Sequence, residues 1–181
     1  MGFFKDDLKK VRAFIFDVDG VLSHQTQALT AEGELIRTSC TKDGYAIMYA
    51  VRKGYIVAVI SGGGTPGLRA RLGKLGLKSE DIYLKIANKL EALDEIFQRY
   101  HLQKEEVVYM GDDIPDYNVM CQVGVPVCPL DACEEIKSIA RYVSDLKGGD
   151  GCARDIIAQV LKVRGDWMDT GCYVKSIKGC F

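Results

Sequence analysis

A short apolar run near the start of the chain stops abruptly at two aspartates. Residues 13–16 (Ala-Phe-Ile-Phe) predict a buried β-strand, and Asp17 and Asp19 follow it. Ligands of parallel α/β sheets bind at the carboxyl ends of the strands, so both carboxylates would lie there, with Gly20 allowing a sharp turn. Two adjacent carboxylates repel each other, so ionising both is difficult without a cation. This suggests Mg²⁺, which binds oxygen ligands and keeps coordination positions open for phosphate. Taken alone, the stretch fits a plain strand and Asp-Gly turn equally well.

The composition is that of one ordinary folded domain. The chain has 181 residues, of which 48% are hydrophobic and 27% charged, which argues against disorder. Lys and Arg number 24 against 25 Asp and Glu, so no basic footprint for nucleic acid is expected. We expect no membrane span and no signal peptide. The seven scattered cysteines include no Cys-x-x-Cys pair, which favours buried thiols in a reducing compartment, and the expected location is the cytoplasm.

Apolar runs alternate with amphipathic segments along the chain. This alternation predicts an α/β fold, with a doubly wound, mostly parallel sheet flanked by helices, in a single domain over residues 1–164. Asp43 is expected to cap the first long helix. Further strands are expected at residues 55–60, 82–86, 107–110, 123–127 and 142–143, and helices at 43–53, 66–75, 89–97, 117–121, 133–140 and 153–163.

Two segments fall outside this alternation. Short extended pieces at 28–29 and 34–39 predict a β-hairpin flap within about residues 22–40. Residues 165–181 show no periodicity, so we expect a tail that is either disordered or docked on a neighbouring molecule.

Polar residues follow three of the expected strands and open one expected helix. They are Asp17 with Asp19, Ser61 with Gly62, Lys89 at a helix start, and Asp112 with Asp113. Each alone has a plain explanation: a flexible turn, a solvated lysine or an N-cap aspartate. Because parallel strands bring their carboxyl ends to one edge, their joint occurrence in this order favours a phosphate-handling site.

This series of motifs resembles the signature of the haloacid dehalogenase superfamily of phosphatases. The resemblance extends to about residue 163 and implies a Rossmann-like core and Mg²⁺-dependent phosphoryl transfer through an aspartyl-phosphate. It implies that Asp17 is the nucleophile and Asp19 the acid/base. Ser61 and the neighbouring amides would bind the phosphoryl oxygens, and Lys89 would neutralise their charge.

The resemblance also implies a ligand set for the metal. Asp17, the backbone carbonyl of Asp19, and Asp112 would hold Mg²⁺, while Asp113 and Asp116 would support these ligands from outside. An aspartate at position 19 favours a phosphohydrolase over a dehalogenase, because only the phosphate ester needs that acid/base.

No interval between these motifs is long enough for a cap domain. The flap, one helix and one strand fill the interval from Asp19 to Ser61, and one helix and a short strand fill that from Ser61 to Lys89. A capless monomer would leave its site open to water, so we expect self-association in which neighbouring subunits close the site.

Four segments resemble the 3-deoxy-D-manno-octulosonate 8-phosphate phosphatases of lipopolysaccharide synthesis, which form tetramers. They are residues 42–45, 88–89, 111–116 and 148–154. By this resemblance the substrate is a sugar-acid phosphate, Lys42 and Asp43 lie near the sugar, and Gly62 and Gly63 contact the substrate. Arg71 would face the substrate carboxylate, or else lie on a solvated helix face.

Two positions depart from the pattern of these relatives. Gly63 and Asp150 stand where relatives often have arginine. A 9-phosphate phosphatase for nine-carbon sugar acids (nonulosonates) is therefore an alternative. A non-catalytic module that oligomerises or regulates is disfavoured, since it predicts loss of catalytic residues that this chain retains.

Overall fold

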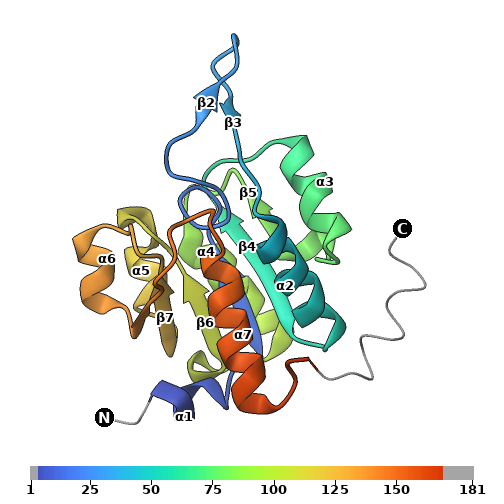
Figure 1. Ribbon diagram of the computed structural model, residues 1–181, viewed down its shortest axis with the longest axis vertical. Helices are drawn as coiled ribbons and strands as arrows, with labels where there is room; N and C mark the ends of the chain where they lie inside the picture. The colour runs from blue at the N-terminus through green and yellow to red at the C-terminus, as the bar shows by residue number, and fades with distance from the viewer. Residues whose placement is uncertain (1–3, 169–181) are drawn as a thin grey trace.

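The computed structural model describes residues 4–168, and its centre is a six-stranded parallel sheet (Figure 1). The strand order is β5-β4-β1-β6-β7-β8. The strands are β1 Ala13–Phe16, β4 Ile56–Ser61, β5 Ile82–Leu84, β6 Val107–Met110, β7 Val125–Cys128 and β8 Tyr142–Val143. Each neighbouring pair is parallel, which confirms the predicted doubly wound sheet. The order reverses at β1, so the crevice of the sheet opens beside the residues that follow β1.

Helices cover both faces of the sheet. They are α1 Phe4–Leu8, α2 Thr41–Arg52, α3 Pro66–Lys74, α4 Lys89–Tyr100, α5 Tyr117–Met120, α6 Glu134–Ile139 and α7 Cys152–Arg164. Successive side chains of β1 point to opposite faces: Phe14 and Phe16 join the core beneath α2 and α7, and Ala13 and Ile15 join the core beneath α4 and α5. Because β1 is buried on both faces, its sequence is a continuous apolar run.

A β-hairpin forms the predicted flap. Strands β2 (Ala28–Leu29) and β3 (Leu35–Ile36) pair antiparallel, and Figure 1 shows the hairpin projecting from the sheet domain. Between the flap and residue 89 the chain forms only α2, β4, α3, one short 3₁₀ turn and β5. The described part of the chain therefore has no cap domain in either interval, as predicted.

The start of α2 corrects one prediction. The helix begins at Thr41, with Cys40 in the N-cap position, so Asp43 is not the cap of its own helix. Asp43 is buried in the first turn, and its Oδ1 accepts a hydrogen bond from the Arg154 backbone N–H at 2.7 Å. Arg154 lies in the first turn of α7, whose N-cap residue is Gly151 and has no side chain to donate or accept. Asp43 therefore caps a partner helix that is 111 residues away in sequence.

The first residues of the expected tail fold back on this helix pair. Gly165 ends α7 with φ of 76°, and the Trp167 ring packs edge-on against Tyr49 at 5.5 Å between centroids. The Tyr49 hydroxyl donates to the Asp166 carbonyl at 3.0 Å. The rest of the expected tail, from residue 169 onward, lies outside the described residues. Among residues 4–168, no helix is both long and apolar enough to cross a bilayer.

Candidate active site

The carboxyl ends of three adjacent strands meet at one cavity. Asp17 follows β1, Ser61 ends β4 and Asp112 follows shortly after β6. All three line a cavity of about 770 Å³, together with Lys89 at the start of α4. The structure thus brings the four predicted motifs together, as the parallel topology requires.

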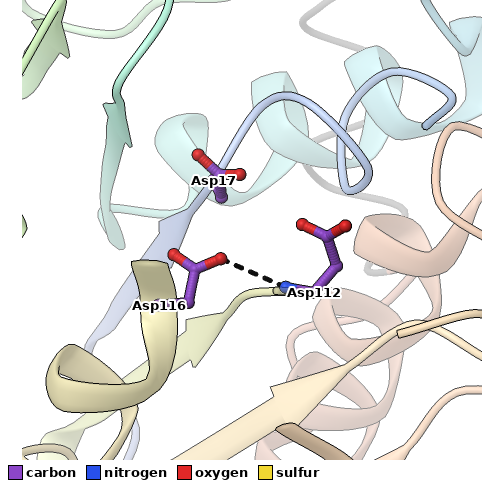
Figure 2. A group of neighbouring side chains, drawn as sticks. All are labelled: Asp17, Asp112 and Asp116. Atoms are coloured by element: carbon purple, nitrogen blue, oxygen red, sulfur yellow. Dashed lines mark hydrogen bonds between the residues drawn. The ribbon is translucent and has the colours of Figure 1, made fainter. Parts of the chain in front are cut away.

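Three buried carboxylates form the floor of this cavity. Asp17, Asp112 and Asp116 each place an oxygen within 4.8 Å of the others, and Figure 2 shows the three side chains gathered around one space. Two glycines make this approach sterically feasible. A Cβ at Gly20 would lie 2.0 Å from the Asp112 Oδ2, and one at Gly111 would lie 2.4 Å from the Asp116 Cβ.

Lys89 is the cation that contacts this cluster within the described residues. Its Nζ lies 2.8 Å from the Asp17 Oδ1 and 2.8 Å from the Asp116 Oδ1, and its side chain is 8% exposed. Burial raises the pKa of Asp17 to about 7, and the charge of Asp116 adds to the rise, which Lys89 only partly offsets. Burial also raises the pKa of Asp112 to about 7, with further contributions from the charges of Asp17 and Asp116.

This excess of negative charge fits a hard divalent cation. One lysine balances at most one of the three carboxylate charges, and carboxylate oxygens are the ligands that Mg²⁺ prefers. Asp17 and Asp112 are the two members best suited to bind it, because Asp116 has both oxygens engaged.

Hydrogen bonds fix Asp116 in place. Its Oδ1 accepts from Lys89 Nζ and, at 2.6 Å, from the Tyr109 hydroxyl, while its Oδ2 accepts the Asp112 backbone N–H at 3.2 Å. Asp116 thus orients both the lysine and the loop that carries Asp112. Asp113, by contrast, is exposed at the rim of the cavity and lies outside the carboxylate cluster.

The wall beside β4 is polar and nearly free of side chains. Ser61 is buried, its Oγ accepts the Gly63 N–H at 3.2 Å, and Gly62 and Gly63 line the cavity. A hydroxyl and closely spaced backbone amides at this position form a surface suited to an oxyanion.

Asp19 lies on the flap side of the cavity. Its Oδ1 accepts from Arg37 Nε and from Gln27 Nε2, both at 2.8 Å, and from the Ser23 hydroxyl at 3.3 Å, while its Oδ2 accepts from Arg37 Nη2 at 2.8 Å. Burial alone would raise the pKa of Asp19, but the hydrogen bonds from Arg37 and Gln27 together hold that pKa below its ordinary value.

The residues expected near the sugar do not reach this cavity. Lys42 is exposed and lines neither this cavity nor its neighbour. Asp43 and Arg71 line a second cavity of about 260 Å³, between the flap, α2 and α3. The Asp150 Oδ1 accepts a hydrogen bond from the His24 Nε2 at 2.9 Å, which links the loop of Asp150 to the base of the flap.

Sequence reasoning missed four polar residues around the site. Gln25 donates to the Asp112 Oδ2 at 3.2 Å and to the Asp131 carbonyl, and Gln27, Arg37 and Tyr109 contact the other carboxylates. Gln25 and Gln27 are two residues apart in the polar stretch after Asp19. This spacing is a weak sequence signal that both side chains point toward the site. Arg37 and Tyr109 carry no such signal, since one lies in the flap and the other in an apolar strand.

Comparisons with known proteins place these features in a family. Residues 68–156 match the model of the haloacid dehalogenase-like hydrolases. The 3-deoxy-D-manno-octulosonate 8-phosphate phosphatase KdsC of Yersinia pestis is 34% identical over 151 residues, which cover 83% of this chain and 80% of that protein. The crystal structure of the phosphatase of that name from Yersinia pestis aligns with a TM-score of 0.86 and 32% identity, over 91% of this chain and 88% of that one. The cobalt-bound form of a deoxy-D-mannose-octulosonate 8-phosphate phosphatase from Haemophilus influenzae aligns with a TM-score of 0.85 and 27% identity, over 93% and 99%.

The raised pKa values predict how pH and Mg²⁺ affect stability. The ordinary aspartate pKa is 3.8, and those of Asp17 and Asp112 are about 7, so the folded protein holds protons that the unfolded chain has lost between roughly pH 4 and 7. The free energy of unfolding of the metal-free protein therefore falls as the pH rises through this window. Above pH 7, where both buried carboxyls are ionised, the loss of stability is complete. We expect Mg²⁺ at about 100 times its Kd to add about 2.7 kcal/mol at pH 8, or roughly 5–10 °C in Tm, and far less at pH 5.5.

Two variants check this prediction by thermal melting with and without MgCl₂. Asp112→Asn should abolish the Mg²⁺-dependent rise in Tm, and Asp94→Asn, an exposed residue of α4, should retain it. A rise of equal size at pH 5.5 and pH 8 would contradict the assignment of these carboxylates to the metal.

Proposed function

This chain belongs to the haloacid dehalogenase-like hydrolases and is a phosphoric monoester hydrolase, and from that premise we propose that its substrate is 3-deoxy-D-manno-octulosonate 8-phosphate. The observation that carries the proposal is the charge cluster of Asp17, Asp112 and Lys89 at the carboxyl edge of the sheet, in a chain whose relative at 34% identity bears that activity. The reaction would release the eight-carbon sugar acid and phosphate, in the cytoplasm, as a step toward lipopolysaccharide.

The positions of the side chains suit a two-step transfer. Asp17 attacks the phosphorus atom and forms an aspartyl-phosphate, while Asp19 protonates the departing sugar oxygen and later deprotonates the attacking water. Lys89, already 2.8 Å from the Asp17 Oδ1, holds the nucleophile and neutralises phosphoryl charge. Ser61 and the amides after it would hydrogen-bond the phosphoryl oxygens from the β4 side.

Mg²⁺ is the proposed cofactor. Asp17, Asp112 and the backbone carbonyl of Asp19 would hold it, with Asp116 orienting Asp112 through its backbone N–H. When bound, the cation supplies charge neutralisation for the phosphate and the nucleophile. Asp113, at the rim of the cavity, would support the metal ligands from a greater distance.

A nine-carbon sugar-acid 9-phosphate is the alternative substrate. Gly63 contributes no side chain to the β4 wall of the cavity, so this wall lacks a side-chain contact that could select the eight-carbon acid. A non-catalytic module is disfavoured, because the chain retains the residues expected for catalysis and all of them line one cavity. They are Asp17, Asp19, Lys89 and Asp112.

Steady-state kcat/KM on a panel of phosphate esters tests the choice of substrate. With Mg²⁺, we expect 3-deoxy-octulosonate 8-phosphate to exceed neutral sugar phosphates and p-nitrophenyl phosphate by about 100-fold, which is about 2.7 kcal/mol of transition-state discrimination. The same preference for a nonulosonate 9-phosphate would shift the assignment to the alternative. Flat and slow rates across the panel would refute the sugar-acid proposal while leaving the phosphatase chemistry in place.

Asp17→Asn tests the nucleophile. An amide cannot form the acyl phosphate, so kcat should fall by more than about 10³-fold. The variant should stay folded and, without metal above pH 7, melt higher than the parent, because one of three repelling buried charges is gone. Asp145→Asn, at an exposed position, is the matched control. Substantial Mg²⁺-dependent turnover by Asp17→Asn would exclude this residue as the nucleophile.

We also propose that the protein is a homotetramer in which neighbouring subunits close the open cavity. Three large apolar side chains of the flap, Leu29, Leu35 and Ile36, are 62%, 40% and 52% exposed, which is unfavourable unless another surface covers them. Light scattering should give about four times the chain mass of 20.0 kDa. Replacing Leu29 and Ile36 by serine should lower that mass, and Leu146→Ser, outside the flap, should not. A monomer for the parent protein would contradict the proposal.

A further inference from the structure

Arg37 is a flap residue whose side chain is largely buried beside the catalytic cavity. It follows β3, where the neighbouring Leu35 and Ile36 are exposed, yet its own side chain is only 11% exposed. Its Nε and Nη2 donate to the two oxygens of Asp19 at 2.8 Å each, which is the parallel fork geometry in which arginine binds a carboxylate most strongly. The flap thus places a guanidinium directly on the proposed acid/base.

The guanidinium occupies space that Gly63 leaves open. A Cβ at Gly63 would lie 2.4 Å from the Arg37 Nη2 and 3.0 Å from the Asp19 Oδ2. Gly63 and Asp19 line the catalytic cavity, whereas Arg37 lines the second cavity with Asp43 and Arg71. Arg37 therefore lies at the boundary between the place where the phosphate would bind and a neighbouring cavity beneath the flap.

The contact must be exchanged for substrate to react. The departing oxygen of a phosphate ester has to reach Asp19, but both oxygens of Asp19 already accept hydrogen bonds from Arg37. Removing one partner of such a pair leaves the other charge largely buried and unpaired, which is strongly unfavourable. A substrate that carries its own carboxylate offers the guanidinium a replacement acceptor besides the phosphoryl group, which Lys89 and Ser61 would bind. A neutral sugar phosphate has no second anionic group to offer.

We propose that Arg37 is a specificity-determining residue whose guanidinium exchanges the Asp19 carboxylate for the carboxylate of the substrate. The proposal rests on the proposed function, because it requires a substrate that is an acid. Recognition of the acid group and release of Asp19 are then a single event, and selectivity against neutral phosphate esters follows from the cost of an unpaired arginine. Among the described residues that line the two cavities, the cationic ones are Lys89, Arg37 and Arg71, and of these Arg37 contacts Asp19.

Three substrates separate this role from a merely structural one. The panel is 3-deoxy-octulosonate 8-phosphate, the neutral D-arabinose 5-phosphate, and p-nitrophenyl phosphate, whose leaving group departs without a proton. In the Arg37→Ala variant we expect the ratio of kcat/KM for the acid over the neutral sugar to fall about 100-fold, and the ratio for the acid over p-nitrophenyl phosphate to fall by a similar factor. Arg37→Lys keeps the charge but loses the fork, so its ratio should fall by about 10-fold. Glu32→Ala, at an exposed site in the flap turn, should leave the ratio unchanged.

The pattern of losses decides the outcome. Equal loss on both sugar phosphates would mean that Arg37 only positions Asp19, and equal loss on all three substrates in both Arg37 variants would mean that it only holds the flap; either result overturns the proposal. If the parent protein itself shows no preference for the acid, the proposed function fails instead.

A second measurement does not depend on turnover. The product sugar acid, without phosphate, should inhibit p-nitrophenyl phosphate hydrolysis competitively, and Arg37→Ala should weaken this inhibition about 100-fold. In the double variant Arg37→Ala/Gly63→Arg, a guanidinium is supplied from the opposite wall, and we expect part of the inhibition to return. Unchanged inhibition by the acid in Arg37→Ala would refute carboxylate binding by this residue.

Discussion

The mutual repulsion of three buried carboxylates is the constraint on which this active site depends. Asp17, Asp112 and Asp116 are each less than 10% exposed and converge within 4.8 Å, an arrangement that water cannot relieve. The protein offsets part of the cost through Lys89 and the Tyr109 hydroxyl, and leaves the remainder for a divalent cation. The unfavourable charge is therefore the source of the metal affinity, since the cation removes a cost that the fold has already imposed.

The fold can hold such a cluster because its core is continuous on both sides of the sheet. Side chains from β1 alternate between two helix-covered cores, so the strand cannot shift to separate its terminal aspartate from the others. Asp43 ties α2 to the N-terminus of α7, and the loop before α7 reaches the base of the flap through Asp150 and His24. The rigid sheet thus fixes the charge cluster, while longer-range hydrogen bonds join the surrounding segments to it.

Local patterns predicted the sheet, most of the helices and the convergence of the strand ends, because period-2 and period-3.6 burial and parallel topology leave few arrangements open. They did not predict the contacts that depend on three-dimensional proximity. Asp43 looked like a cap for its own helix, and nothing local indicates that its acceptor is needed by α7. The sequence around Tyr109 predicts an ordinary apolar strand residue, but its hydroxyl donates to Asp116. The sequence around Arg37 predicts a surface residue of the flap, but its guanidinium binds Asp19. Each of these pairings joins a polar side chain to a partner that the sequence alone does not identify.

The side chains of the two aspartates in the first motif, Asp17 and Asp19, are held by different parts of the molecule. Asp17 is fixed by the buried cluster and the central strand, whereas the Asp19 side chain is held by Arg37, Gln27 and Ser23, all from the segment between β1 and α2. A movement of the exposed hairpin would change the partners of Asp19 without disturbing Asp17, the proposed nucleophile. Under the proposed function, the rigid sheet would carry the phosphate chemistry and the flap would respond to the sugar. In a capless enzyme, selectivity can therefore change through flap residues such as Arg37 while the charge cluster stays the same.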